Sequence, residues 1–212
     1  MRRLSIFSRP LFASSFLALL APGGAPAADP WELLAGARDR LAAVPQVADF
    51  TQTFVPAGFS SGETESGSVA LALPDLARWD YRQPFPRTFL VQGETVFTWN
   101  EGETSGRSFA LSADEAHHLD LLRLDVGVLS RHYGATIARA GETDVEVRLV
   151  PSDGGPGLAE VSLTLRAADL LPTSLAYRDS EGNATRFTFV AFRPLAGTDV
   201  FLPPTDIEWL AP

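Results

Sequence analysis

Three histidines are the side chains best suited to bind a metal or to transfer a proton near neutral pH, but their spacing does not form a site. His117 and His118 are neighbours, so a regular helix would point them about 100° apart. His132 lies 14 residues beyond His118, well outside the i, i+4 spacing of a helical metal pair. We expect solvated or helix-capping histidines, and we predict neither a metal nor another cofactor.

Covalent catalysis also has little support from the residue types. The sequence has no Cys, and all 17 basic residues are Arg, which excludes thiol and lysine nucleophiles. Ser112, Asp114 and His117 are close in sequence, but Ser112 and Glu115 form the capping box of a helix, so a helix start explains this cluster. We also expect no nucleophile elbow of the kind found in many hydrolases. We therefore predict that the protein is not an enzyme.

Residues 1–27 have the pattern of a cleavable secretory signal peptide. Three arginines precede a short apolar stretch at residues 11–20, and residues 25–27 (APA) match the A-x-A cleavage pattern. We expect export to the periplasm and a single mature domain at residues 28–212. The formal charge is −9 for the whole chain and −12 for the mature part, with 26 acidic residues against 14 arginines. Such a chain is a poor match for nucleic acid.

A mostly β framework must hold the remaining candidate residues. Asp29 and Pro30 are typical N-cap and first-turn residues of a helix that Pro45 ends. Residues 112–133 predict a second helical insert, split near Asp125. Elsewhere apolar and polar residues alternate, most clearly at residues 69–73, 77–82, 144–149, 160–166 and 186–191. This period of two predicts about ten antiparallel strands with one wet face, arranged as a sandwich or a barrel.

Aromatic residues are abundant on the apolar faces of these strands. They could fill a core against the helices, or they could line an apolar cavity for a lipid in an incompletely closed barrel. The alternation alone does not separate the two arrangements. The residues are Phe50, Phe54, Trp79, Tyr81, Phe89, Phe97, Trp99, Phe187, Phe189 and Phe192.

Several motifs, taken in order, resemble the LolA family of periplasmic outer-membrane lipoprotein carriers. Residues 47–54 (VADFTQTF) are similar to an early strand with the pattern F-x-x-x-F-x-Q, and residues 67–71 (GSVAL) to the strand that follows it. Residues 74–81 (PDLARWDY) and 90–100 (LVQGETVFTWN) resemble a P-x-x-x-R/N-W segment and the next hairpin. Residues 200–204 (VFLPP) look like the F-x-x-P-P ending. The resemblance spans roughly residues 30–205.

The resemblance implies a mainly β fold, a single unclosed antiparallel barrel of about 10–11 strands with a helical lid. It implies a carrier that takes lipoprotein acyl chains, or another lipid, from the inner to the outer membrane. Its partners would be an inner-membrane release complex and an outer-membrane acceptor, and the expected state is a monomer. The candidate cavity and lid residues are Phe50, Leu71, Leu73, Trp79, Tyr81, Phe89, Phe97, Trp99, Leu121, Leu122, Leu124, Phe187 and Phe189.

Two positions depart from the family pattern. Leu73 stands where family members have an Arg that holds the lid, and Ala77 stands where an aromatic residue helps to engage the release complex. Arg78 lies five residues after Leu73, so a regular strand places it on the opposite face. The alternatives are a lipid-sensing module on the same fold, like the regulator RseB, and a periplasmic hydrolase. The receptor LolB, which has a similar fold, is a lipoprotein and would need a Cys.

Overall fold

The computed structural model of the protein describes residues 28–111, 121, 123–152 and 158–211. Several predictions made above concern other residues and lie outside this part of the chain. They are the signal peptide at residues 1–27, the histidines His117 and His118, the capping box of Ser112, Asp114 and Glu115, and the candidate lid residue Leu122.

Two α-helices are described, and both begin where the sequence indicates. Helix α1 spans Pro30–Ala42, and the Asp29 carboxylate accepts a hydrogen bond from the backbone N–H of Trp31 at 2.9 Å. Helix α3 spans Val126–His132, and the side chain of Asp125 caps it by accepting from the N–H of Val128 at 3.1 Å. The predicted N-terminal helix is therefore confirmed, and α3 begins directly after the predicted split near Asp125.

The strands form one 12-stranded sheet in the order β12-β6-β5-β4-β3-β2-β1-β11-β10-β9-β8-β7. Among the described strands, neighbours pair antiparallel except β6 and β12, which are parallel. The strands are β1 (Gln46–Val55), β2 (Glu63–Ala72), β3 (Leu76–Gln83), β4 (Arg87–Gln92), β5 (Thr95–Asn100), β6 (Ser105–Ala110), β7 (Tyr133–Ala140), β8 (Asp144–Pro151), β9 (Leu158–Arg166), β10 (Pro172–Asp179), β11 (Ala184–Pro194) and β12 (Glu208–Leu210).

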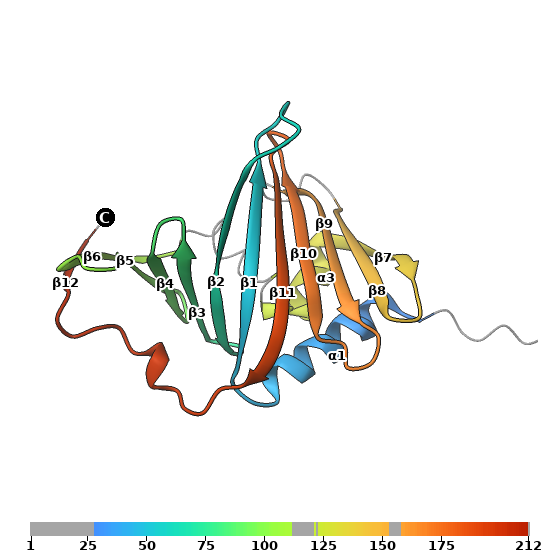
Figure 1. Ribbon diagram of the computed structural model, residues 1–212. Helices are drawn as coiled ribbons and strands as arrows, with labels where there is room; N and C mark the ends of the chain where they lie inside the picture. Colours follow the sequence, from blue (N-terminus) through green and yellow to red (C-terminus); the bar gives the residue numbers. More distant parts are fainter. Residues whose placement is uncertain (1–27, 112–120, 122, 153–157, 212) are drawn as a thin grey trace, which may run out of the picture.

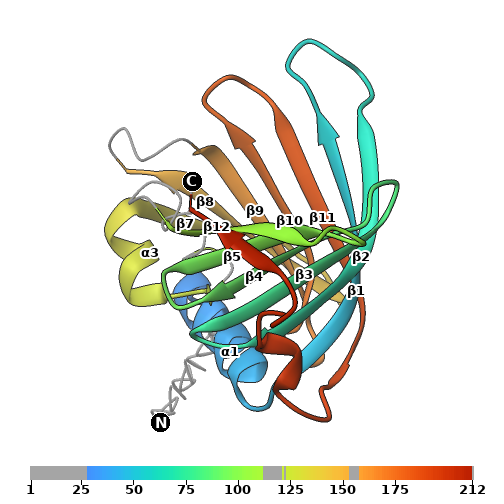
Figure 2. The same ribbon diagram turned by 90° about the vertical axis from the view of Figure 1, so that its left-hand side faces the viewer.

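The sheet curves strongly but stays unclosed, with β12 and β7 as its two edges. Figures 1 and 2 show it wrapping around α1 and α3, which lie on its concave side. The predicted unclosed, mainly β fold is therefore confirmed. The sheet has more strands than the expected 10–11, and β12, which is three residues long, gives too short a pattern to be recognised from sequence.

Strand alternation creates a separate apolar cluster on each face of the sheet. The larger one lies on the concave face and includes the buried side chains of Leu34 and Leu41 from α1 and Leu129 from α3. The smaller one lies on the other face and consists of Ala70, Leu90 and Phe201. Phe201 is 1% exposed and belongs to a 3-10 turn at Asp199–Phe201, in the segment that joins β11 to β12.

Neither described helix could serve as a membrane span. Within the residues that the structure describes, no helix is both long and apolar enough to cross a bilayer.

Candidate functional site

An aromatic cluster covers the centre of the concave face. Phe50 of β1 makes edge-to-face contacts with Trp79 and Tyr81 of β3, with ring centroids 5.0 Å apart in each pair. Trp79 also contacts Phe187 of β11 at 5.2 Å and Phe189 at 6.2 Å. The strand register explains this arrangement, because β1 lies between β2 and β11 and pairs Phe50 with both Gly67 and Phe189. Five predicted site residues are thus brought together.

Gly67 permits the close approach of β3 to β2 beneath this cluster. A Cβ at residue 67 would overlap the carbonyl oxygen of Asp80. The register between the two strands also shifts at this point, between Ser66 and Gly67. A larger residue there would push β3 away and displace the aromatic side chains that it carries.

Side chains from α1 and from the residues just before α3 pack onto the centre of the aromatic cluster. Leu121 and Leu124 are each 4% exposed and join the same apolar cluster. Together with Leu71, Trp79 and Phe189 they line a cavity of about 30 Å³, roughly the volume of one water molecule. Drug-sized ligands need pockets of roughly 300–1,000 Å³. An acyl chain could therefore reach the aromatic cluster only if these helical segments moved aside.

Leu73 lies at the edge of the same apolar cluster and is partly buried against it. It lines a second small cavity, of about 10 Å³, together with Ala77 and Arg123. The Arg123 guanidinium donates a hydrogen bond to the carbonyl oxygen of Gly93, in the β4–β5 turn, at 2.5 Å. This hydrogen bond links the described part of the helical insert to the sheet, and its donor is an Arg of the insert.

Four polar side chains, Gln52, Glu65, Tyr81 and Arg87, border the aromatic cluster; we call them the polar collar. Arg87 makes a bidentate ion pair with Glu65, with N–O distances of 2.6 and 2.8 Å. Its guanidinium lies 4.2 Å from the centre of the Tyr81 ring, and the Tyr81 hydroxyl donates to the Gln52 amide oxygen at 2.5 Å. Phe89 packs at the same edge, with its ring centroid 5.8 Å from that of Tyr81.

Burial and pairing shift the pKa values of two collar residues. Burial raises the pKa of the Tyr81 hydroxyl from 10.0 to about 12, because the charged phenolate would lose its hydration. The hydrogen bonds to Glu65 raise the pKa of Arg87 above its already high ordinary value. The collar therefore holds a neutral Tyr and a permanently charged but paired Arg at neutral pH.

Phe97 and Trp99, two of the predicted site residues, lie away from the aromatic cluster. Their rings contact Trp209 of β12, with centroids 5.1 and 5.7 Å apart, and they pack with the cluster on the other face of the sheet. In β5 it is Val96 that faces the concave side, so alternation turns both aromatics away. We therefore leave them out of the candidate site.

Arg78 lies on the face opposite Leu73, but not through a regular strand, because residues 73–75 form the turn between β2 and β3. Its guanidinium sits 5.4 Å from the centre of the Trp99 ring and pairs with Asp80 at 2.9 Å. It also donates to the carbonyl oxygen of Val200 at 2.8 Å, which ties the segment before β12 to the outer face of β3. These contacts all lie on the outer face, so we leave Arg78 out of the candidate site.

Residues 58–62 (GFSSG) match the letters of the G-x-S-x-G motif, but their setting differs from a nucleophile elbow. An elbow is a sharp turn from a strand into a helix. Here the segment lies between β1 and β2, which pair as an antiparallel hairpin. Phe59 is 71% exposed, so the loop projects into solvent. The match therefore gives no support to the hydrolase alternative.

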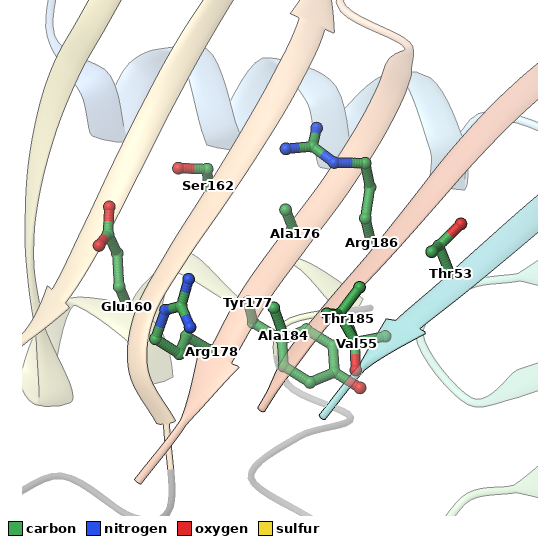
Figure 3. A pocket seen from close by; sticks show the side chains of 10 residues that line it. All are labelled: Thr53, Val55, Glu160, Ser162, Ala176, Tyr177, Arg178, Ala184, Thr185 and Arg186. Carbon is green, nitrogen blue, oxygen red and sulfur yellow. The ribbon is translucent and has the colours of Figure 1, made fainter. Parts of the chain in front are cut away.

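A larger hollow of about 360 Å³ lies on the convex face over β1, β9, β10 and β11. Figure 3 shows Glu160, Arg178 and Arg186 around the short side chain of Ala176, with α1 behind the sheet. Glu160 is paired with Arg148 at 2.9 Å, and Arg178 donates to the carbonyl oxygen of Gly182 at 2.7 Å. The hollow is open to solvent and is bordered by three charged side chains, so it would not shield an acyl chain from water.

Sequence reasoning missed the collar residues Gln52, Glu65 and Arg87, as well as Arg123. Strand alternation could have placed the three collar residues on the concave face, but nothing local indicates that they meet. Among the described residues, no group of three or more His, Cys, Asp or Glu side chains is arranged to hold a metal ion.

Comparisons with known proteins agree with the fold and with the motifs. Two relatives named outer-membrane lipoprotein carrier protein match most of the chain. That of Halorhodospira halophila is 29% identical over 154 residues, 69% of each chain. That of Dechloromonas aromatica is 27% identical over 167 residues, 76% of this chain and 78% of the relative.

Solved structures share the fold at low sequence identity. An uncharacterized conserved protein from Thermus thermophilus has a TM-score of 0.56 at 14% identity, over 85% of this chain and 98% of that protein. A chain of the Pseudomonas aeruginosa MucA/MucB complex has a TM-score of 0.53 at 12% identity, over 84% of this chain and 62% of its own length.

The family model described as outer membrane lipoprotein carrier protein LolA matches residues 45–199. This match covers more than half of the sequence and includes β1 to β11. It confirms the resemblance that the motifs indicate. The protein therefore belongs to the LolA family of outer membrane lipoprotein carrier proteins.

Proposed function

We propose that the protein is a periplasmic carrier that holds the acyl chains of lipoproteins, or of another lipid, on its concave face. The observation that carries this proposal is the aromatic cluster beneath the helices. An acyl chain could cover this cluster in place of the helices. The residues proposed to contact the chains are Phe50, Leu71, Leu73, Trp79, Tyr81, Phe89, Leu121, Leu124, Phe187 and Phe189. The names of the two relatives support lipoproteins as the cargo, and the family match supports a role without covalent chemistry.

The energetics suit a reversible carrier. Each buried methylene contributes about 0.8 kcal/mol, so one chain of about 15 methylenes could gain about 12 kcal/mol. Lifting Leu121, Leu124 and Leu129 off the sheet would expose apolar surface and offset part of that gain. The helices thus keep the empty face out of water and prevent the loaded state from becoming irreversible.

Export, delivery partners and assembly state are part of the same proposal. Cleavage after residue 27 would release a periplasmic monomer that takes cargo from an inner-membrane release complex and passes it to an outer-membrane acceptor. The acidic chain, with a formal charge of −9 before cleavage, would be repelled by anionic membrane surfaces and would stay mobile between them.

A direct test is to express the protein with residues 1–27, purify it from the periplasm without detergent, and identify bound lipids by mass spectrometry. We expect acylated lipoproteins or lipids at a reproducible stoichiometry. Lipid-free protein in repeated preparations that also takes up no apolar dye would contradict the proposal. Recovery of one specific protein without lipid would favour a sensing module.

Quenching of tryptophan fluorescence by a brominated fatty acid would show where the acyl chain binds. Trp79 is 7% exposed on the concave side, whereas Trp99 lies on the other face. In one variant Trp31, Trp99 and Trp209 are replaced by Phe, and in the matched control Trp79 is replaced instead of Trp99. We expect strong quenching of Trp79 and weak quenching of Trp99. Equal quenching of both tryptophans would show that the acyl chain does not bind on the concave face.

A further inference from the structure

The polar collar lies on the concave face, away from the end where α1 meets the sheet. The Gln46 side chain donates to the carbonyl oxygen of Arg40 at 2.8 Å, which places the end of α1 beside the start of β1. Gln52 is six residues further along β1, about 20 Å at about 3.3 Å per residue. Figure 1 shows β1 and β2 extending well beyond the helices in that direction. The collar therefore borders the end of the aromatic cluster that lies farther from α1.

Neighbouring strands bring the four collar residues together. Gln52 of β1 pairs with Glu65 of β2, and Tyr81 of β3 pairs with Arg87 of β4. The side chains of Arg87 and Glu65 are 25% and 18% exposed, so solvent or a ligand reaches them. An acyl chain lying on Phe50 and Trp79 would therefore end beside these groups, where its polar head needs partners.

The charges of the collar decide which head group it suits. Glu65 occupies two N–H groups of Arg87 and neutralises its charge. A guanidinium has five N–H donors, so three remain, and the Gln52 amide adds donors of its own. Donors without net charge suit the carbonyl oxygens of esters and amides. A free carboxylate would instead meet the negative charge of Glu65 in a partly buried site, where repulsion is weakly screened.

We propose that Gln52, Glu65, Tyr81 and Arg87 form a head-group subsite that selects uncharged ester- or amide-linked acyl groups over free fatty acids. This inference rests on the proposed function, since it assumes that acyl chains occupy the aromatic surface. Glu65 acts as the specificity-determining residue because its ion pair neutralises the Arg87 charge, which would otherwise attract a carboxylate. Removing the Glu65 charge should convert the collar into a carboxylate site.

The test compares palmitate with monopalmitoylglycerol, which has the same chain, by displacement of a fluorescent apolar dye at pH 8. We expect the unmodified protein to bind the glyceride about 10-fold more tightly. Glu65→Gln should tighten palmitate binding about 10-fold, because Arg87 then offers a charge-assisted hydrogen bond. Adding Arg87→Gln to that variant should abolish the gain. Arg82→Gln is the matched control, since Arg82 is 61% exposed and pairs with Asp49 instead.

The outcomes separate the two proposals. Equal affinities for both probes, unchanged by Glu65→Gln, would overturn the collar inference and leave the carrier function standing. Failure of the dye and both probes to bind any variant would contradict the carrier function, and the collar inference would fall with it. Urea midpoints measured for every variant show whether an altered affinity reflects unfolding instead.

Discussion

Truncation of Leu129 tests whether α3 must move for a ligand to enter. Leu129 is the buried residue of this short helix and is 0% exposed. Replacing a buried Leu by Ala costs about 2–5 kcal/mol. If loading lifts α3 from the sheet, Leu129→Ala destabilises the empty, covered form more than the loaded form. A differential of about 1.4–2.8 kcal/mol would tighten binding of an acyl probe about 10- to 100-fold.

Leu149→Ala is the matched control. Leu149 is 2% exposed and belongs to the same apolar cluster, but it is carried by the sheet strand β8 and not by α3. We expect a similar loss of stability with little change in probe affinity. A loss of stability combined with tighter binding would then be specific to the substitution in α3.

The measurements are a fluorescence titration with a fatty-acyl probe and a urea unfolding curve for each variant. A tighter Kd combined with a lower urea midpoint in Leu129→Ala is the expected result. If Leu129→Ala binds the probe no more tightly than Leu149→Ala, α3 stays in place during loading. The covering role that we assign to this helix would then be wrong.

Three further predictions concern other contacts. Arg123→Met removes the hydrogen bond to Gly93 and should tighten probe binding about 10-fold by titration, whereas unchanged binding would show that this contact does not hold the helical insert. Phe201→Ala should lower the unfolding free energy by about 3–5 kcal/mol in urea, while the adjacent Leu202→Ala, at a residue that is 62% exposed, should stay within about 0.5 kcal/mol; similar losses would contradict the packing of the outer cluster. Burial raises the pKa of Tyr81 from 10.0 to about 12, so the unfolded chain loses this proton first and stability should fall as the pH rises from 10 towards 12. Tyr81→Phe should reduce that fall in urea midpoint, and an unchanged fall would assign it to other groups.

Local signals predicted much of the fold. Asp29 caps α1 and Asp125 caps α3, because a short carboxylate can satisfy backbone N–H groups within a few residues of itself. Alternation also predicted the strands. These features depend on neighbours in sequence, and the sequence pattern therefore contains them directly.

Long-range pairing could not be predicted in the same way. Arg123 donates to a carbonyl 30 residues away, and Arg87 reaches a carboxylate 22 residues away. Trp99 turns to the outer face, where Trp209 of the short strand β12 covers it. In each case the partner is chosen by how the sheet curves and which strands become neighbours, and a single strand pattern does not carry that information.

The strand order also has a consequence for how the chain folds. β1 pairs with β11, and β6 pairs on its outer side with β12. Strands early in the sequence therefore complete their pairing only when much later strands are available. Contacts between residues so far apart in sequence slow folding and leave strand edges unpaired meanwhile. Nascent chains that have not yet produced β11 would leave one edge of β1 unpaired, and they would be the forms most in need of a chaperone.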